Sequence, residues 1–224
     1  AYIAGDSLAL SKAAISFPQK VIVFCGVNFM AESASILNPD KTVLLPVKDA
    51  GCPMADMISA ADLKKLKQQH KDGVVVCYVN STARVKAESD ICCTSSNAVE
   101  IVRSLKEKKI IFIPDKNLGL YVQSQVPEKT YVFYEGFCPT HISLTAPQVK
   151  QAQRAHPRAE FLAHPECTPE VIALADYVFS TAGILTHVKN SSCKEFIIGT
   201  EEGISYALEN QNPGKKFIFP SKKL

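Results

Sequence analysis

The apolar stretch VIVF at residues 21–24 recurs as IIFI at residues 110–113 and, shortened, as FII at residues 196–198. Each run is almost continuously apolar and rich in Val, Ile and Phe, which is typical of a strand buried on both faces. Seven further runs are predicted strands: 42–45, 74–79, 90–93, 131–134, 161–163, 177–179 and 217–219. Segments with helical periodicity lie between them: 31–37, 60–70, 98–106, 147–155, 169–174 and 204–210. This alternation predicts an α/β fold with parallel sheets.

The same spacing of about 86–89 residues connects two other series of landmarks. Cys52 follows the strand at 42–45 and Cys138 follows the strand at 131–134, while Ser7, Ser95 and Thr181 each stand where a strand gives way to a helix. Three series in phase predict three repeated units, residues 1–52, 53–137 and 138–224, each a three-layer αβα sandwich. Such small units are expected to pack pseudo-threefold around one central site. The first unit is incomplete, because its counterpart of the strand at 74–80 would fall before Ala1.

Composition and charge exclude several classes of protein. The chain has 25 basic and 22 acidic residues, a net charge of +3, without Lys and Arg clusters interleaved with aromatic residues. This argues against a nucleic-acid or membrane-surface protein, and no apolar run approaches the ~18–20 residues that span a bilayer. Eight cysteines without a visible signal peptide favour a reducing cytoplasm. Cys25, Cys77, Cys92 and Cys93 are predicted to be small buried hydrophobic side chains.

The hydroxyl residues Ser7, Ser95 and Thr181 form the first candidate site. Each of them alone is most simply explained as the N-cap of a helix. Three at equivalent places in three repeats would point backbone N–H groups toward one centre, an arrangement that binds anions such as phosphate or carboxylate. We therefore predict a small substrate that carries several negative charges.

Two repeat-equivalent pairs form the second candidate site. Tyr78 and Asn80 lie at the end of one predicted strand, and His164 and Glu166 lie 86 residues further on at the end of another. Residues at i and i+2 on a strand face the same side, so the site would contain phenol, amide, imidazole and carboxylate groups. Glu166 is the candidate base, with His164 and Tyr78 as proton or orientation partners. His141 is expected to support Cys138 and to do no more.

Cysteines form the third candidate site. Cys52 and Cys138 both follow a strand by a short loop and precede proline, and the repeat places a third equivalent at or just beyond Leu224. Three thiolates around a threefold axis suit an iron–sulfur cluster with one open iron, which could act as a Lewis acid on a substrate. Paired CxxC spacing, which would favour zinc, is absent from the sequence. Cys167 is a spare candidate ligand.

Several of these stretches together resemble the quinolinate synthase family: GDSLALSKAA, VNFMAESASILNPDKTVLLP, AGCPMADM, YVNSTARVKAESDICCTSSNAVEIV, PDKNLGLYV, FCPTHIS, AHPECTPEV and ADYVFSTAGI. The resemblance is collinear from Gly5 to at least Gly199. It implies three αβα units around one site, and a [4Fe–4S] cluster held by three cysteines, of which Cys52 and Cys138 would be two. It also implies condensation of iminoaspartate with dihydroxyacetone phosphate to form quinolinate, with loss of phosphate and two waters.

The resemblance also implies roles for single residues. Ser7, Ser95 and Thr181 would hold phosphate or carboxylate groups, and Phe29 and Met30 would line the pocket. Tyr78, Asn80, His164 and Glu166 would form the catalytic and substrate-orienting set. A biosynthetic enzyme of this kind is expected in the cytoplasm, with possible functional coupling to L-aspartate oxidase.

The sequence departs from the family at its ends, which leaves two alternatives open. The amino-terminal strand with its His-x-Tyr element, the third cluster cysteine and the final helices of the family have no counterpart between Ala1 and Leu224. One alternative is a cluster-free hydratase or aldolase that acts on another small phosphate ester. The other is a truncated, inactive scaffold that binds anions.

Overall fold

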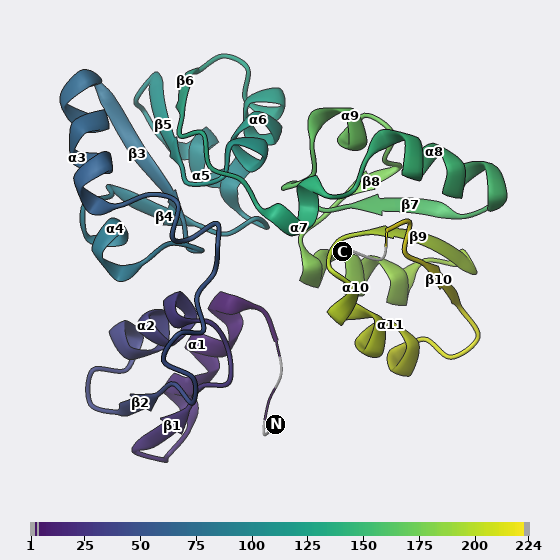
Figure 1. Cartoon of the computed structure of the whole chain (residues 1–224), viewed down its shortest axis with the longest axis horizontal. Helices are drawn as coiled ribbons and strands as arrows, with labels where there is room; N and C mark the ends of the chain where they lie inside the picture. Colours follow the sequence, from purple (N-terminus) through teal and green to yellow (C-terminus); the bar gives the residue numbers. More distant parts are fainter. Residues whose placement is uncertain (1–2, 4, 222–224) are drawn as a thin grey trace. The chain divides into compact units, whose positions relative to one another are not determined.

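A computed structural model describes residue 3 and residues 5–221 of the chain. The chain forms two compact units, a first unit of Ala1–Lys116 with Val126–Gly136 and a second unit of Asn117–Gln125 with Phe137–Leu224. Figure 1 shows the elements of both units. Among the described residues, no helix has the length and apolar character that crossing a membrane requires.

All ten predicted strands are present, and all are paired in parallel. Their bounds are β1 (Val21–Val23), β2 (Thr42–Leu44), β3 (Gly73–Tyr78), β4 (Ile91–Cys93), β5 (Lys109–Ile113), β6 (Thr130–Phe133), β7 (Glu160–Ala163), β8 (Tyr177–Val178), β9 (Glu195–Gly199) and β10 (Lys216–Ile218). The predicted α/β class with parallel sheets is confirmed.

The six predicted helices are confirmed within a few residues: α2 (Asn28–Leu37), α3 (Ala60–Gln69), α5 (Ala98–Ser104), α8 (Ala146–Ala155), α9 (Pro169–Ile172) and α11 (Ser205–Gln211), the last preceded by a 3₁₀ turn at Glu202–Ile204. Five more helices had no predicted span: α1 (Ser7–Ser16), α4 (Ala83–Ala87), α6 (Lys116–Gln125), α7 (Pro139–Ile142) and α10 (Thr181–Asn190). Capping side chains explain where several of these helices begin. For example, Ser59 and Asp62 form a reciprocal capping box at α3.

The two four-stranded sheets share one topology (Figure 1). The first unit has the order β4-β3-β5-β6 and the second unit has β8-β7-β9-β10. Equivalent strands begin 86 or 87 residues apart, as at Gly73 and Glu160 or at Lys109 and Glu195. A hydrogen bond from a strand N–H to an aspartate just before the edge strand recurs as well. Asp90 accepts from the N–H of Val75 at 2.8 Å, and Asp176 accepts from that of Phe161 at 2.7 Å. The repeat seen in the sequence is therefore also a repeat of structure.

One lysine contact recurs three times at about the spacing of the repeat. Lys41 donates to the carbonyl groups of Ala14 and Phe17 at the end of α1, Lys129 donates to those of Leu105 and Glu107 at the end of α5, and Lys215 donates to those of Val188 and Ser191 at the end of α10. In each copy the cation satisfies carbonyls at the carboxyl end of the helix, where positive charge is favoured. This contact ties the helix to the loop before the last strand of each copy.

Helices cover both faces of the sheet in the second unit. Phe161 of β7 and Ile197 of β9 pack with residues of α8 and α9, whereas Leu162 and Phe196 pack with residues of α10 and α11. Neighbouring residues of one strand thus enter opposite cores, which is the geometry of a three-layer sandwich.

The sheet formed by β1 and β2 differs from the prediction of strands buried on both faces. Ile22 and Val43 pack against Leu10 and Ala34 of α1 and α2, but Val21 and Val23 on the other face are 54% and 60% exposed. Within the described part of the chain, helices cover only one face of this two-stranded sheet. For the same reason Cys25, predicted to be buried, is exposed.

Candidate functional site

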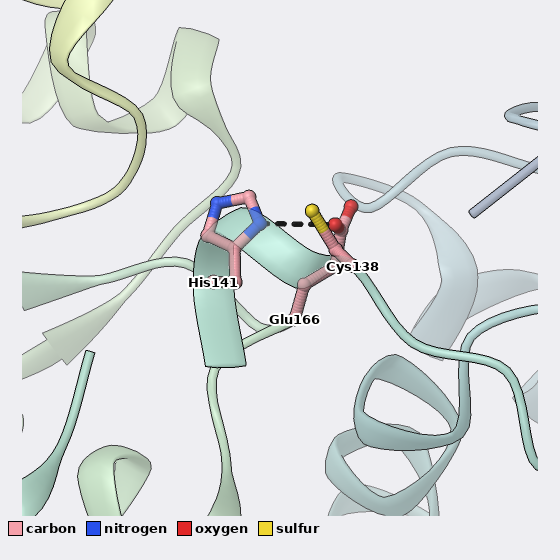
Figure 2. Close-up of side chains that lie close together, drawn as sticks. All are labelled: Cys138, His141 and Glu166. Carbon is pink, nitrogen blue, oxygen red and sulfur yellow. Dashed lines mark ion pairs between the residues drawn. The ribbon is translucent and has the colours of Figure 1, made fainter. Parts of the chain in front are cut away.

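The carboxyl end of β7 carries the most densely connected polar cluster among the described residues. His164 and Glu166 follow the strand directly, and both side chains are buried. The short helix α7 brings Cys138, its N-cap residue, and His141 to the same place (Figure 2). Pro139 at the first helical position suits this start because it needs no hydrogen-bond acceptor there.

His141 is the centre of the cluster. Its Nδ1 lies 3.0 Å from Oε2 of Glu166, and its Nε2 lies 3.0 Å from Oγ1 of the buried Thr200. Its ring stacks on that of His164, with ring centroids 4.5 Å apart and planes at 20°. The Glu166 carboxylate lies beside both stacked imidazole rings, because its Oε1 is also 3.8 Å from Nδ1 of His164.

His164 is a neutral imidazole at neutral pH. The N–H of Glu166 donates to its Nδ1 at 3.3 Å, which requires this nitrogen to be unprotonated. The pKa of His164 is lowered to about 3, mainly by burial; the Glu166 charge raises it in opposition, and His141 adds a smaller lowering effect. The sequence-based expectation that His164 titrates near neutral pH does not match this environment.

Cys138 carries a protonated thiol in this environment. Burial raises the pKa of Cys138 to about 12, and the neighbouring Glu166 charge raises it as well. Because a bound cation would favour the thiolate instead, the thiol is suited to a metal and unsuited to act as a free nucleophile.

The same residues offer donor atoms for a metal. One donor atom from each of Cys138, His141 and Glu166 lies within 4.8 Å of the other two. Nδ1 of His141 is buried and has no aligned hydrogen bond within the described part of the chain, despite its short distance to Glu166. Thiolate, imidazole and carboxylate donors are all compatible with iron, so these residues can accommodate an iron-containing group.

The predicted site residues of the first unit lie at the ends of its strands and helices. Tyr78 is buried at the end of β3, and Asn80 follows it half-buried. Phe29 is buried in the first turn of α2, where Lys86 lies 5.5 Å from its ring, and Met30 is half-buried beside it. Cys52 is half-buried in the loop after β2. The third cysteine, predicted at or beyond Leu224, lies outside the described residues.

The three hydroxyl residues are not helix caps. The N-cap positions of α1, α5 and α10 are taken by Asp6, Asn97 and Ser180. Ser7 and Thr181 are instead the first residues of their helices, and Ser95 lies in the turn before α5. The competing explanation of these residues as caps is therefore wrong, and their hydroxyl groups are left for another role.

Two features escaped the sequence analysis. Thr200 completes the cluster, but its counterpart one repeat earlier is Pro114, so the repeat carried no signal for a hydroxyl group there. His187 was not singled out from the sequence; it lies in α10, and its Nε2 lies 2.8 Å from Oε2 of Glu160.

Comparison with known proteins identifies the same family along the whole chain. The family described as Quinolinate synthetase A protein matches residues 1–224. The chain is 57% identical to a quinolinate synthase of Caldicellulosiruptor bescii over 213 residues, which cover 95% of this chain and 70% of the relative. It is 55% identical to that of Methanosarcina barkeri, over 97% of this chain and 71% of the relative. It is also 55% identical to that of Geotalea uraniireducens, over 99% and 73%.

Proposed function

The chain belongs to the quinolinate synthase family, and we propose that it condenses iminoaspartate with dihydroxyacetone phosphate in the biosynthesis of NAD. The products are quinolinate, phosphate and two waters. The identity of 57% over 95% of the chain supports this reaction over a cluster-free hydratase or aldolase, and a measurement of turnover distinguishes it from the inactive scaffold. The proposal for single residues rests on the buried contact between Glu166 and His141.

Glu166 is the proton-transferring group in this proposal. Condensation and ring closure require protons to be removed from carbon and nitrogen and delivered to leaving hydroxyl groups, and a carboxylate at the end of a parallel strand can do both. His141, 3.0 Å from Oε2, orients the carboxylate, and Thr200 orients His141 in turn.

His164 and Tyr78 serve orientation in this proposal. A neutral imidazole can donate from its Nε2 to a substrate oxygen without exchanging its proton at neutral pH. Tyr78, the repeat equivalent of His164, offers a phenol at the end of β3. Asn80, equivalent to Glu166, offers an uncharged amide that can bind a substrate group without competing for protons.

The hydroxyl side chains are proposed to bind the anionic groups of the substrates. Ser7, Ser95 and Thr181 are free of a capping role, and hydroxyl groups are good donors to phosphate and carboxylate oxygens. Phe29 and Met30 are proposed to line the apolar side of the pocket.

The proposed cofactor is a [4Fe–4S] cluster held in part by Cys52 and Cys138. The donor set around Cys138 fits iron, as described above. When bound, the cluster would supply an open iron that acts as a Lewis acid on the substrate. Around it, the residues of the chain orient Glu166, bind the anionic groups and keep His164 neutral.

We further propose that the three repeats surround one central site. The shared sheet topology and the recurring lysine contact support the equivalence of the repeats. A cytoplasmic location and functional coupling to L-aspartate oxidase, which would supply the unstable imine, remain predictions drawn from the family.

The test is anaerobic reconstitution, with iron and sulfide, of the chain extended through the predicted third cysteine. It is followed by incubation with dihydroxyacetone phosphate and iminoaspartate formed from oxaloacetate and ammonia. Quinolinate is expected in the protein-containing reaction, and Cys138→Ser is expected to lower both bound iron and quinolinate. Cys193→Ser, at a half-exposed cysteine outside the cluster, is the matched control. Iron bound at wild-type level by Cys138→Ser would contradict the ligand assignment, and absence of quinolinate from an iron-loaded protein would contradict the reaction.

A further inference from the structure

Two cysteines outside the candidate site lie side by side in the first unit. Cys77 of β3 and Cys92 of β4 are direct partners in the parallel register of these strands. Neighbouring strands are about 4.8 Å apart, which falls within the Cα separations that a disulfide can bridge. Partners in register point to the same face of the sheet, so both thiols lie on the face covered by α3 and α4.

The two thiols differ in their exposure. Cys77 is fully buried and packs with Val75 and Val85. Cys92 lies on an edge strand, since β4 pairs only with β3 among the described strands, and it is exposed, contrary to the prediction of a buried side chain. An exposed thiol can meet a reagent from solution, and a buried neighbour can then displace that reagent.

The electrostatic surroundings favour reaction at Cys92. The neighbouring Cys77 side chain lowers the pKa of Cys92 to about 7, and the Lys86 ammonium lowers it as well, against the effect of burial. The same pairing and burial raise the pKa of Cys77. Lys86 is held in place because its Nζ donates to Oγ of Ser33 at 2.7 Å. The exposed member of the pair is therefore the stronger nucleophile at neutral pH.

We propose that Cys77 and Cys92 form a reversible redox pair that a small-molecule disulfide converts into an intramolecular disulfide. The Cys92 thiolate attacks one sulfur of the reagent, forming a mixed disulfide and releasing one thiolate. Cys77 then attacks Sγ of Cys92, and its proton passes to the second thiolate as that thiolate leaves. The two protein thiols are oxidised to one disulfide, and the reagent is reduced to two thiols.

The disulfide would affect two strand ends that carry proposed substrate-binding residues. Tyr78 directly follows Cys77, and Ser95 follows Cys92 by three positions. A covalent bond between the strands would restrict the separation of these ends. Formation of the bond itself depends only on the geometry of the first unit, so its test is independent of the proposed function.

The test is anaerobic equilibration of the 224-residue chain with mixtures of oxidised and reduced glutathione, followed by acid quenching, alkylation and tryptic mapping. Cys77 and Cys92 fall in separate tryptic peptides, residues 72–84 and 87–103. We expect these peptides to become linked, and reduction to separate them. Cys92→Ser is expected to abolish the link, whereas Cys93→Ala, which removes the adjacent cysteine of the same peptide, is expected to keep it.

A second measurement tests the order of steps. In Cys77→Ala, glutathione is expected to remain on Cys92, with at least about tenfold more adduct than in the unmodified sequence, because no neighbour displaces it. The exposed Cys25 is the internal control, and its adduct should be equal in both proteins. A link that survives in Cys92→Ser, or a stable glutathione adduct on Cys92 of the unmodified sequence without any link, would overturn the proposal.

Discussion

The two four-stranded repeats have the same strand order but different chemistry at equivalent strand ends. In the second unit, the end of β7 carries His164 and Glu166, joined by His141 and Thr200 into one buried cluster. One repeat earlier, the equivalent positions are Tyr78, Asn80, Ala55 and Pro114. None of these four counterparts carries a titrating carboxylate or imidazole.

The repeated backbone fold therefore does not determine which proton-transferring side chains stand at its strand ends. The strand order and the lysine contact with helix carboxyl ends recur in both repeats, because they stabilise the sandwich itself. The polar cluster occurs at one of the two strand ends and depends on all four of these differences. The first repeat is thus suited to binding and the second to proton transfer, and the following predictions test this division.

The largest effect is expected for Glu166→Gln. Replacing the carboxylate by an amide, as at the equivalent Asn80, should lower quinolinate formation by about 10²- to 10⁴-fold, since general acid–base catalysis contributes that much. The melting temperature should stay within a few degrees of the original. Glu195→Gln, at a half-exposed carboxylate near His156, is the matched control and should retain activity. Retained turnover in Glu166→Gln would contradict the assignment.

His141→Phe should have the next largest effect. The ring would still stack on His164, but the contacts to Glu166 and Thr200 would be lost. We expect kcat to fall by about 10- to 100-fold, the usual effect of removing an orienting partner, with a smaller change in KM. Thr200→Val removes one contact of His141, so its kcat should lie between those of the unmodified protein and of His141→Phe. Unchanged kcat in His141→Phe would show that Glu166 needs no orienting partner.

Ser95→Ala and Thr181→Ala should each weaken substrate binding by about 1–3 kcal/mol, the value of a hydrogen bond to a charged group. The effect should appear in KM for the anionic substrates. The neighbouring cap Ser180 provides a contrast, because Ser180→Ala should cost about 1 kcal/mol of stability and leave KM unchanged. If Thr181→Ala instead lowered stability without affecting KM, the hydroxyl would be structural.

The smallest effect is a pH dependence of stability. As the pH falls below the usual value of 6.5, the unfolded chain protonates His164 before the folded protein, whose His164 has a pKa of about 3. Folding is therefore disfavoured by acid, by about 1 kcal/mol between pH 6.5 and pH 5.5. Urea unfolding at both pH values should show this loss, and His164→Gln should remove it. Equal pH slopes for the two proteins would mean that His164 is accessible to protons in the folded state.

The sequence predicted the strands, their parallel arrangement and the repeat. Runs such as IIFI at 110–113 bury both faces, so the apolar pattern alone identifies them. Short helices such as α4 and α7 were not predicted, since spans of five and four residues show too little periodicity. The exposed face of β1 and the exposure of Cys92 also required the structure, because an apolar run does not reveal whether a second layer covers it.

For the candidate site, the residue order was enough to place Tyr78 with His164 and Asn80 with Glu166 at equivalent strand ends, because each pair is separated by 86 residues. Tertiary structure alone decided how those residues interact. His141 and Thr200 are 59 residues apart in the chain, and their 3.0 Å contact arises only because α7 and the end of β9 meet beside Glu166. The low pKa of His164 has the same origin, since burial is a property of the folded packing and leaves no trace in the residue order.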